Sequence, residues 1–312
     1  MNSQPWFVYL LALLAMLFWG MSFIWSTIVF EYYDPITTVF LRLIISTTIL
    51  WIIIKLWKKN EKIRKEHYKL LLLSSLLNPF LYFIGENFGL KLTSPAISSV
   101  IISTIPLFTP IAGIYVLKEK LGKATIAGMI ISFFGVLIML IKPDMSMAAS
   151  PAGVGFLALA IAVAVGYSVL LKKLTTYYSA LTIVFTQNFI GIWYFLPLFL
   201  LMDFKKFLTV VPDQRLISSL LLLAFFASSL AFVFYTITTK QLGISRANIF
   251  TNIIPVFTAI FSFFFIGEKF DAPKLAGIFM VLAGVALSQY KRKMSIVSAY
   301  RYITFTKEKK SK

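Results

Sequence analysis

The stretch IPLFT at positions 105–109 decides the fold of this chain, because it returns as IPVFT at positions 254–258. Each copy is followed by a Glu-Lys pair, Glu119-Lys120 and Glu268-Lys269. Both copies lie in strongly apolar segments, where a proline removes a backbone hydrogen bond that hydrocarbon cannot replace. A costly feature that occurs at two corresponding places indicates an internal repeat.

The similarity extends well beyond the two prolines. A shift of 149 residues, from 105 to 254, aligns the stretch 105–136 with 254–285 without a gap, and a shift of 146 aligns the front halves more loosely. Shared Pro, Thr, Glu-Lys and Ala-Gly carry more weight here than shared Leu or Ile would. The identical pairs are Ile105/Ile254, Pro106/Pro255, Phe108/Phe257, Thr109/Thr258, Glu119/Glu268, Lys120/Lys269, Ala127/Ala276, Gly128/Gly277, Gly135/Gly284, Val136/Val285, Gly20/Gly166, Ser22/Ser168 and Tyr32/Tyr178.

The composition is typical of a membrane protein. Hydrophobic residues make up 59% of the chain and charged residues only 13%, whereas a soluble domain carries about 25% charged residues. The net charge of +18 does not indicate nucleic acid, because the basic residues gather between apolar segments, as the positive-inside rule expects. We therefore expect a lipid bilayer around the protein and no nucleic-acid partner.

Ten segments are long enough to cross the bilayer, which takes about 20 apolar residues per helix. Lys and Arg concentrate on alternate loops, which predicts that both termini are cytoplasmic. The chain divides into a first five-helix repeat (1–146), a second (147–294) and a basic cytoplasmic tail (295–312). The predicted spans are 6–30, 35–57, 69–90, 95–117, 122–141, 151–171, 178–202, 215–239, 245–266 and 272–290.

The odd number of helices per copy sets the fold class. With five helices each, the second copy enters the bilayer from the side opposite to the first. The sequence therefore predicts an all-α membrane protein of ten transmembrane helices, arranged as two inverted-topology repeats. That arrangement is associated with transporters that work by alternating access.

Several of these motifs resemble one family. Trp19-Gly20-x-Ser22, the stretch GLKLTSPAISSVIISTIPLFTPIAGIYVLKEKL and its echo LGISRANIFTNIIPVFTAIFSFFFIGEKF are similar to the EamA-type members of the drug/metabolite transporter superfamily. Lys118 departs from the pattern, since the family usually has Gly before the Glu. The resemblance implies a bundle around a central cavity and transport of small metabolites, often amino acids outward, across the plasma membrane (the bacterial cytoplasmic membrane).

Polar residues and helix interruptions near mid-bilayer are the candidates for a substrate site. The alternative for each of them is a simple hydrogen bond between helices, worth roughly 0.6 kcal/mol. The predicted substrate-binding residues are Trp19, Asn78, Tyr82, Ser103, Gln187, Asn188, Tyr235 and Asn252, and the predicted helix interruptions are Pro79, Pro106 and Pro255.

Two charged residues lie well inside predicted spans, Arg42 and Glu86. Each costs roughly 2.5–3.5 kcal/mol to insert unless it is satisfied. Both lie at a similar depth from the external side. Two interpretations remain open: a static salt bridge between them, or a role for Glu86 in coupling transport to protons.

The glycines of the two Ala-Gly…Gly-Val motifs recur along one face of the fifth and tenth predicted helices. Small residues let helix backbones approach closely, so these helices are predicted to form a scaffold or the seam of a homodimer. The glycines are Gly128, Gly135, Gly277 and Gly284.

The leading functional interpretation is a secondary transporter of a small-molecule substrate, and the family resemblance favours export. The alternative is a lipid or lipid-linked sugar flippase. An enzyme is not expected, because the chain has no Cys and only one acid within a span, so no catalytic residue is assigned. We expect no metal and no cofactor, and no Walker-type phosphate loop occurs. The single histidine, His67, is predicted to be solvated.

Overall fold

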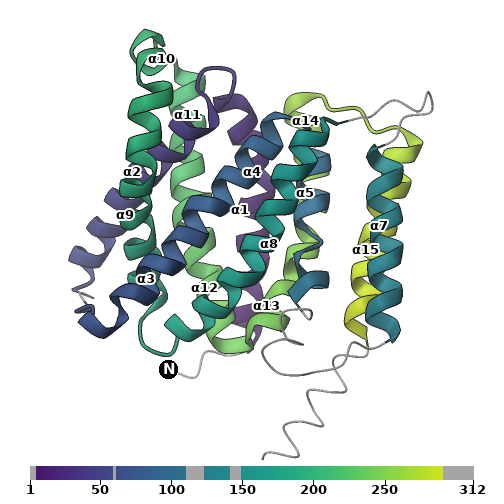
Figure 1. The fold of residues 1–312 in the computed structure, drawn as a ribbon, viewed down its shortest axis with the longest axis horizontal. Helices are drawn as coiled ribbons and strands as arrows, with labels where there is room; N and C mark the ends of the chain where they lie inside the picture. Colours follow the sequence, from purple (N-terminus) through teal and green to yellow (C-terminus); the bar gives the residue numbers. More distant parts are fainter. Residues whose placement is uncertain (1–4, 59–60, 110–122, 141–148, 291–312) are drawn as a thin grey trace, which may run out of the picture.

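The computed structural model describes residues 5–58, 61–109, 123–140 and 149–290, and within these ranges it consists of helices without strands (Figure 1). Seven helical stretches in the described part are long and apolar enough to cross a membrane, and three shorter apolar helices accompany them. The long stretches are Trp6–Val29, Pro35–Leu56, Lys65–Lys91, Pro151–Leu174, Ala180–Thr209, Gln214–Leu242 and Arg246–Ile266, and the shorter ones are Pro95–Thr109, Ile126–Leu140 and Ala272–Leu287.

The ten-helix membrane fold predicted from the sequence is confirmed, and each described stretch overlaps one predicted span. The first half contains α1 (Pro5–Val29), α2 (Pro35–Leu56), η1 (Lys65–His67), α3 (Tyr68–Ser75), η2 (Leu76–Leu81), α4 (Tyr82–Lys91), α5 (Pro95–Ile102) and α7 (Lys123–Leu140). The second half contains α8 (Pro151–Leu174), α9 (Ala180–Leu198), η3 (Phe199–Asp203), α10 (Phe204–Thr209), α11 (Gln214–Leu222), η4 (Leu223–Ala231), α12 (Phe232–Leu242), α13 (Ile244–Phe250), η5 (Thr251–Ile253), α14 (Ile254–Ile266) and α15 (Ala272–Tyr290).

Some features predicted from the sequence lie outside the described residues. These are the end of the fourth predicted span beyond Thr109, the basic tail 295–312, and Lys118, Glu119 and Lys120. The boundaries of the two repeats, at 146 and 294, stay predictions.

Local chemistry explains where the helices begin and end. Proline occupies the first turn of α2, α5 and α8, where its missing N–H costs no helical hydrogen bond. The hydroxyl of Ser179 accepts a hydrogen bond from the backbone N–H of Thr182 (3.3 Å) and caps α9. Gly243 and Gly267 end α12 and α14 with φ angles of 85° and 70°, which other residues rarely adopt.

The two halves pack on each other through equivalent helices. In the first half α1 contacts α12 and α14 of the second half, and its counterpart α8 contacts α4 and α5 of the first half. Likewise α2 packs on α9, and α7 packs on α15 at one side of the bundle (Figure 1). This exchange of partners is what a two-fold relation between inverted repeats requires.

One end of the bundle collects the loops predicted to be external. The carboxylate of Asp34, before α2, contacts Lys91 at the end of α4 and Lys206 in α10 (2.8 Å for the latter). Arg215 at the start of α11 pairs with Glu31 after α1 at 2.8 Å. The contacts join the loops between the first and second, third and fourth, and seventh and eighth spans, as alternate crossing demands.

The loops that contain Glu61, Tyr178 and Lys240 meet at the opposite end. Glu61 accepts a hydrogen bond from the backbone N–H of Ser179 (2.9 Å), and the Lys240 ammonium donates to the carbonyl of Tyr178 (3.4 Å). His67 is not solvated as predicted: its side chain is 12% exposed, and its Nδ1 lies 2.8 Å from the Tyr178 hydroxyl. The rings of Tyr177 and Tyr178 pack against this imidazole, a contact that a lysine-rich loop composition does not reveal.

Glycines let α7 and α15 approach closely, as predicted. A Cβ atom on Gly277 would lie 2.6 Å from the carbonyl oxygen of Gly135, and one on Gly284 would lie 2.6 Å from that of Gly128. The hydroxyl of Ser132 reaches across to the carbonyl of Val281 at 3.2 Å. The two helices are therefore held backbone to backbone.

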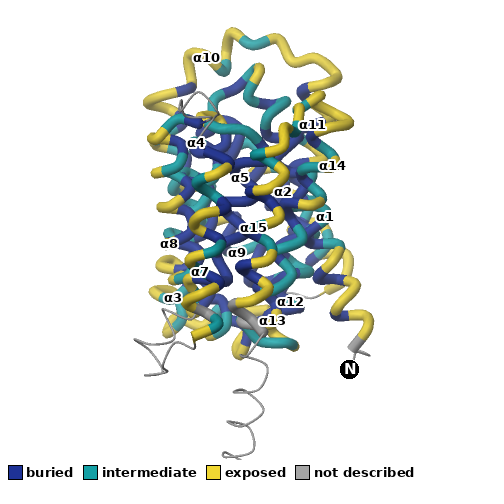
Figure 2. The backbone as a smooth tube through the Cα atoms, turned by 90° about the vertical axis from the view of Figure 1, so that its right-hand side faces the viewer, coloured by how far each residue is buried: buried dark blue, intermediate teal, exposed yellow. Residues whose placement is uncertain are grey.

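Large apolar side chains cover much of the outer surface. Leu201 is 84% exposed and Phe264 is 75% exposed, and exposed residues lie around the outside of the bundle, whereas buried residues fill its interior (Figure 2). A bilayer would cover such a surface.

Candidate functional site

Breaks in the helices occur at equivalent places in the two halves. A π-helical segment in the third span (η2) matches one in the eighth (η4) under the 149-residue shift. In the fourth span α5 ends at Ile102, just before Ile105-Pro106, and in the ninth the short 3-10 turn η5 precedes Ile254-Pro255. Asn78 within η2 has an extended backbone (φ −139°, ψ 120°).

These breaks surround a central cavity, where about 670 Å³ of space, open solvent included, is free of protein atoms. Equivalent residues of the two halves line the cavity together, which places it on the axis that relates them. The lining pairs are Ser22/Ser168, Phe83/Phe232, Glu86/Tyr235, Ile102/Thr251 and Ile105/Ile254.

One wall of the central cavity is aromatic. The Trp19 ring lies 5.1 Å from Phe232 and 5.0 Å from Tyr235, measured between centroids. Phe83 meets Phe232 edge to face at 5.9 Å. Such rings bury the apolar part of a ligand, and the Tyr hydroxyl adds a polar handle.

Arg42 lines the cavity from α2 and is 2% exposed. Its Nε donates to the Ser228 hydroxyl (2.7 Å), and its guanidinium carbon lies 4.3 Å from the centre of the Phe83 ring. The backbone carbonyl of Ser228 in turn accepts from Asn188 (3.3 Å), whose amide also donates to Ser46 (2.9 Å). A buried polar network thus holds one edge of the guanidinium.

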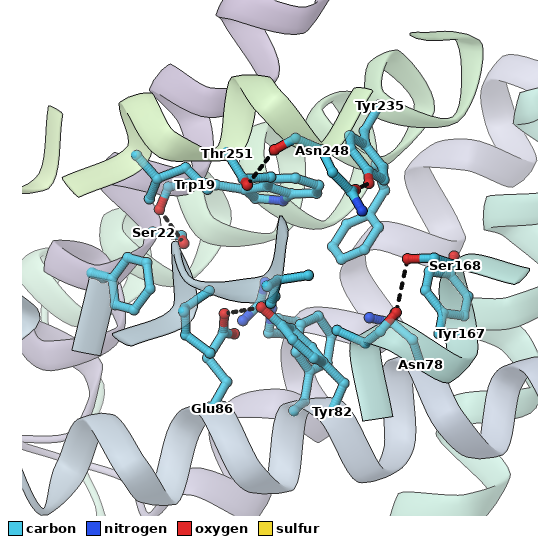
Figure 3. A pocket seen from close by; sticks show the side chains of 18 residues that line it. Trp19, Ser22, Asn78, Tyr82, Glu86, Tyr167, Ser168, Tyr235, Asn248 and Thr251 are labelled. Atoms are coloured by element: carbon cyan, nitrogen blue, oxygen red, sulfur yellow. Dashed lines mark hydrogen bonds between the residues drawn. The ribbon is translucent and has the colours of Figure 1, made fainter. Parts of the chain in front are cut away.

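Glu86 lines the same cavity from α4. Its carboxylate accepts a hydrogen bond from the Tyr82 hydroxyl at 2.8 Å, one helical turn away (Figure 3). Arg42 interacts with it electrostatically. Among the described residues, however, these two side chains form no ion pair within 4.0 Å. The site therefore holds one positive and one negative group that are not in direct contact.

Two further hydrogen-bond chains reach the cavity. The Tyr235 hydroxyl donates to Asn248 (Figure 3), and the Asn248 amide donates to Thr109 at 3.0 Å. The Tyr167 hydroxyl donates to Gln187 at 3.1 Å, and Gln187 donates to Ser74. Both tyrosines are thereby fixed in orientation.

Asn78 has the least satisfied polar side chain of the lining. Its amide has no hydrogen-bond partner within the described part of the chain, although Asn78 is only 6% exposed. By contrast, the hydroxyls of Ser22 and Ser168 bond to carbonyls of their own helices, Trp19 (2.7 Å) and Ala164 (2.8 Å). A ligand in the cavity would meet a free amide at Asn78.

The structure brings together only part of the predicted site. Of those residues, the cavity is lined by Trp19, Asn78, Tyr82, Tyr235, Arg42 and Glu86. The remainder do not line it in this conformation: they are Ser103, Gln187, Asn188, Asn252, Pro79, Pro106 and Pro255.

The residues outside the lining have other surroundings. Gln187 and Asn188 lie one layer behind it and support Tyr167 and Ser228. Ser103 is fully buried and bonds to the Val100 carbonyl at 2.7 Å. The carbonyl oxygen of the Asn252 side chain is buried and has no hydrogen-bond partner within the described ranges.

Sequence reasoning assigned no role in binding to Asn248 and Thr251, which line the cavity. Asn248 lies about one helical turn nearer the start of the ninth span than Asn252, a predicted binding residue, whereas Thr251 adjoins Asn252 and differs from it in lining the cavity. The repeat alignment contained a usable signal, because Thr251 is the counterpart of Ile102 and Asn248 that of Ser99. At these two positions the second half has a larger or more polar side chain than the first half, and such differences between the halves were the signal for cavity-lining residues.

Comparisons with known proteins agree on a class. The model of the EamA-like transporter family matches residues 6–141 and 151–290. The chain is 28% identical over 254 residues to "Uncharacterized transporter YetK" of Bacillus subtilis (strain 168), covering 80% of this chain and 77% of that protein. It is 26% identical over 300 residues to an "Uncharacterized transporter" of Archaeoglobus fulgidus, covering 94% and 99%.

A solved crystal structure shares the fold. It superposes with a TM-score of 0.67 at 15% sequence identity, and the match covers 91% of this chain and 98% of the other. At this identity the likeness concerns the fold alone.

Proposed function

Because the chain belongs to the EamA-like transporter family, we propose that it is a secondary transporter that exports small organic metabolites across the plasma membrane by alternating access. Amino acids and related compounds are the substrates that the resemblance suggests. Both termini would be cytoplasmic, since the end of the bundle that carries Lys172, Lys173 and Lys240 is the basic one.

The observation that carries this proposal is the position of the central cavity between two inverted halves. Equivalent residues such as Phe83 and Phe232 face the same space. If the two halves exchanged their conformations, the cavity would open to the opposite side without moving its contents far. A cavity on such an axis is what alternating access needs.

The lining itself favours binding and release over chemistry. It consists of aromatic and aliphatic side chains with a few polar groups, of which Arg42 and Glu86 are charged. No cofactor enters the proposal, and the energy would come from an ion gradient, for which Glu86 is the candidate proton carrier.

The test is a metabolite comparison followed by reconstitution. Cells with and without the protein are compared by untargeted metabolite analysis, and each depleted compound is then assayed for uptake into proteoliposomes. We expect at least one small organic compound to exchange across the liposome membrane only with the protein present. Movement of a fluorescent lipid instead of any metabolite would favour the flippase alternative and contradict the proposal.

A matched pair of variants tests whether the substrate passes through the central cavity. Ala164 lines the cavity, so Ala164→Trp should fill it and stop exchange. Gly155 in the same helix has nothing within 4 Å of an added Cβ, so Gly155→Trp should transport normally.

A further inference from the structure

The charge of Arg42 is left largely unused by the protein. A guanidinium has five N–H donors, and only Nε has a hydrogen-bond partner among the described residues, the Ser228 hydroxyl at 2.7 Å. With 2% of its surface exposed, the residue cannot satisfy the remaining donors in bulk water. Burial of an unpaired cation at this depth is costly, and this cost indicates that a ligand binds the cation reversibly.

No acid among the described residues is that partner. Glu86, which interacts with Arg42 electrostatically, is held by the Tyr82 hydroxyl at 2.8 Å. In the part of the chain that the structure describes, no acidic oxygen lies within 4.0 Å of the guanidinium. The terminal amino groups of Arg42 are therefore available to a ligand in the cavity.

The guanidinium is also fixed in place before any ligand arrives. Phe83 lies under its face at 4.3 Å, and Ser228 holds its Nε edge. The Asn188 amide fixes Ser228 in turn (3.3 Å to its carbonyl). A planar donor fork held in this way suits the two oxygens of a carboxylate, which it can bind with parallel hydrogen bonds.

We propose that the cavity carries an organic carboxylate, whose carboxylate group pairs with Arg42 while its apolar body lies against Trp19, Phe232 and Tyr235. This assignment rests on the proposed transport function and specifies its substrate class. A single charge is favoured over a dianion such as a phosphate, because the Glu86 carboxylate lies in the same cavity and repels extra negative charge.

Binding of matched probes to the purified protein in nanodiscs tests the proposal. The probes are 3-phenylpropionate and its neutral amide, which have nearly the same shape, and 2-phenylethylphosphonate as the dianion. We expect the carboxylate to bind at least about tenfold more tightly than the amide, since charge-assisted bonds to a buried cation are the strong ones. Equal binding of acid and amide, or no binding of the acid at millimolar concentration, overturns the proposal, as does tighter binding of the phosphonate.

Variants locate the effect. Arg42→Gln should bind acid and amide equally, whereas Arg215→Gln, which removes a positive charge 56% exposed at the external end, should keep the wild-type preference. If Arg42→Gln does not fold, Ser228→Ala retains the cation but removes the 2.7 Å bond, and should weaken the acid several-fold more than the amide. A preference that survives in Arg42→Gln, or in Ser228→Ala where Arg42→Gln does not fold, contradicts a role for Arg42.

Transport separates this proposal from the function on which it rests. If proteoliposomes exchange neutral or cationic metabolites but the protein does not bind the carboxylate probe, the transport function is supported and the carboxylate site at Arg42 is contradicted. If proteoliposomes exchange no compound but the probe binds through Arg42, the carboxylate site is supported and the transport function is contradicted.

Discussion

Glu86 and Tyr235 occupy equivalent positions in the two halves of the chain and line the same cavity. Each belongs to a hydrogen bond of its own, Glu86 with Tyr82 and Tyr235 with Asn248. The cavity is thus built symmetrically but carries its acidic group on one side only. In the transport mechanism proposed above, this symmetry would give a path with two exits, and Glu86 would hold a proton in one of the two states.

The first prediction concerns Glu86→Gln. The variant keeps a hydrogen-bond acceptor for Tyr82 but cannot take up or release a proton. We expect it to lose proton-driven accumulation, with the internal-to-external substrate ratio falling to about one, while downhill exchange continues. Uptake into proteoliposomes with and without an imposed pH gradient measures both. A variant that still concentrates its substrate would make Glu86 a structural residue and the coupling ion a different one.

The second prediction compares two serines in a chain without native cysteine. Ser168 lines the cavity, whereas Ser103 does not and is fully buried. Ser168→Cys should react with a small, charged thiol reagent, and Ser103→Cys should be protected, because a thiol must meet water to react. Labelling rates followed by mass spectrometry decide, and equal rates at the two sites would contradict the placement of the cavity.

The third prediction concerns the contact between α7 and α15. A Cβ on Gly277 would meet the Gly135 carbonyl at 2.6 Å, and this oxygen cannot move without moving the helix. Gly277→Ala should therefore lower the stability by about 1–3 kcal/mol. Gly155→Ala is the matched control, since nothing lies within 4 Å of its added Cβ, and a better helix former should leave it equal or slightly more stable. Thermal unfolding in detergent compares them, and an unchanged Gly277→Ala would contradict the close packing.

The fourth prediction concerns the ion pairs of Asp34 at the end of the bundle that is predicted to be external. Burial would raise the pKa of Asp34, but hydrogen bonds from Lys206 and Lys91 outweigh it and hold this pKa below its ordinary value of 3.8. Because the folded pKa is depressed, the stability that Asp34 contributes is present above pH 3.8 and is lost as the pH falls through the folded pKa. At neutral pH, Asp34→Asn should thus unfold at a lower temperature than the wild type. The loss in free energy of unfolding should be about 1 kcal/mol or less for each ion pair removed.

The difference should vanish in acid, where wild-type Asp34 is itself protonated. Glu66→Gln is the control, because this carboxylate is 65% exposed and its ion-pair distances to Arg64 and His67 are 3.5 and 3.7 Å, so its loss should have no measurable effect. An Asp34→Asn difference that persists unchanged below the folded pKa would show that charge is not its cause.

The fold was accessible from sequence because its signals are long and repeated. Ten apolar runs, several of which have proline in their first turn, specify the spans, and Pro106 and Pro255 reveal the two halves. The predicted ends came within a few residues of α2 (Pro35–Leu56), since charged residues and prolines mark the edges of the hydrocarbon region.

The site was accessible only in part, because sequence position gives the depth of a residue and not the direction in which it faces. Gln187 and Tyr167 lie at similar depth, yet Tyr167 lines the cavity and Gln187 supports it from behind at 3.1 Å. Asn188 likewise faces Ser46 and Ser228. The rotation of a helix is set by its neighbours, and nearly uniform apolar stretches contain little periodicity from which to read it.

Blocking the cavity chemically is the most direct test of whether it is the transport path. Ser168→Cys proteoliposomes are treated with a bulky, charged thiol reagent, and exchange of the transported metabolite is measured before and after, with Ser103→Cys as the control. Full labelling of Ser168→Cys should abolish exchange, and reduction of the mixed disulfide should restore it. Exchange that continues at the original rate through fully labelled Ser168→Cys protein would contradict transport through the central cavity.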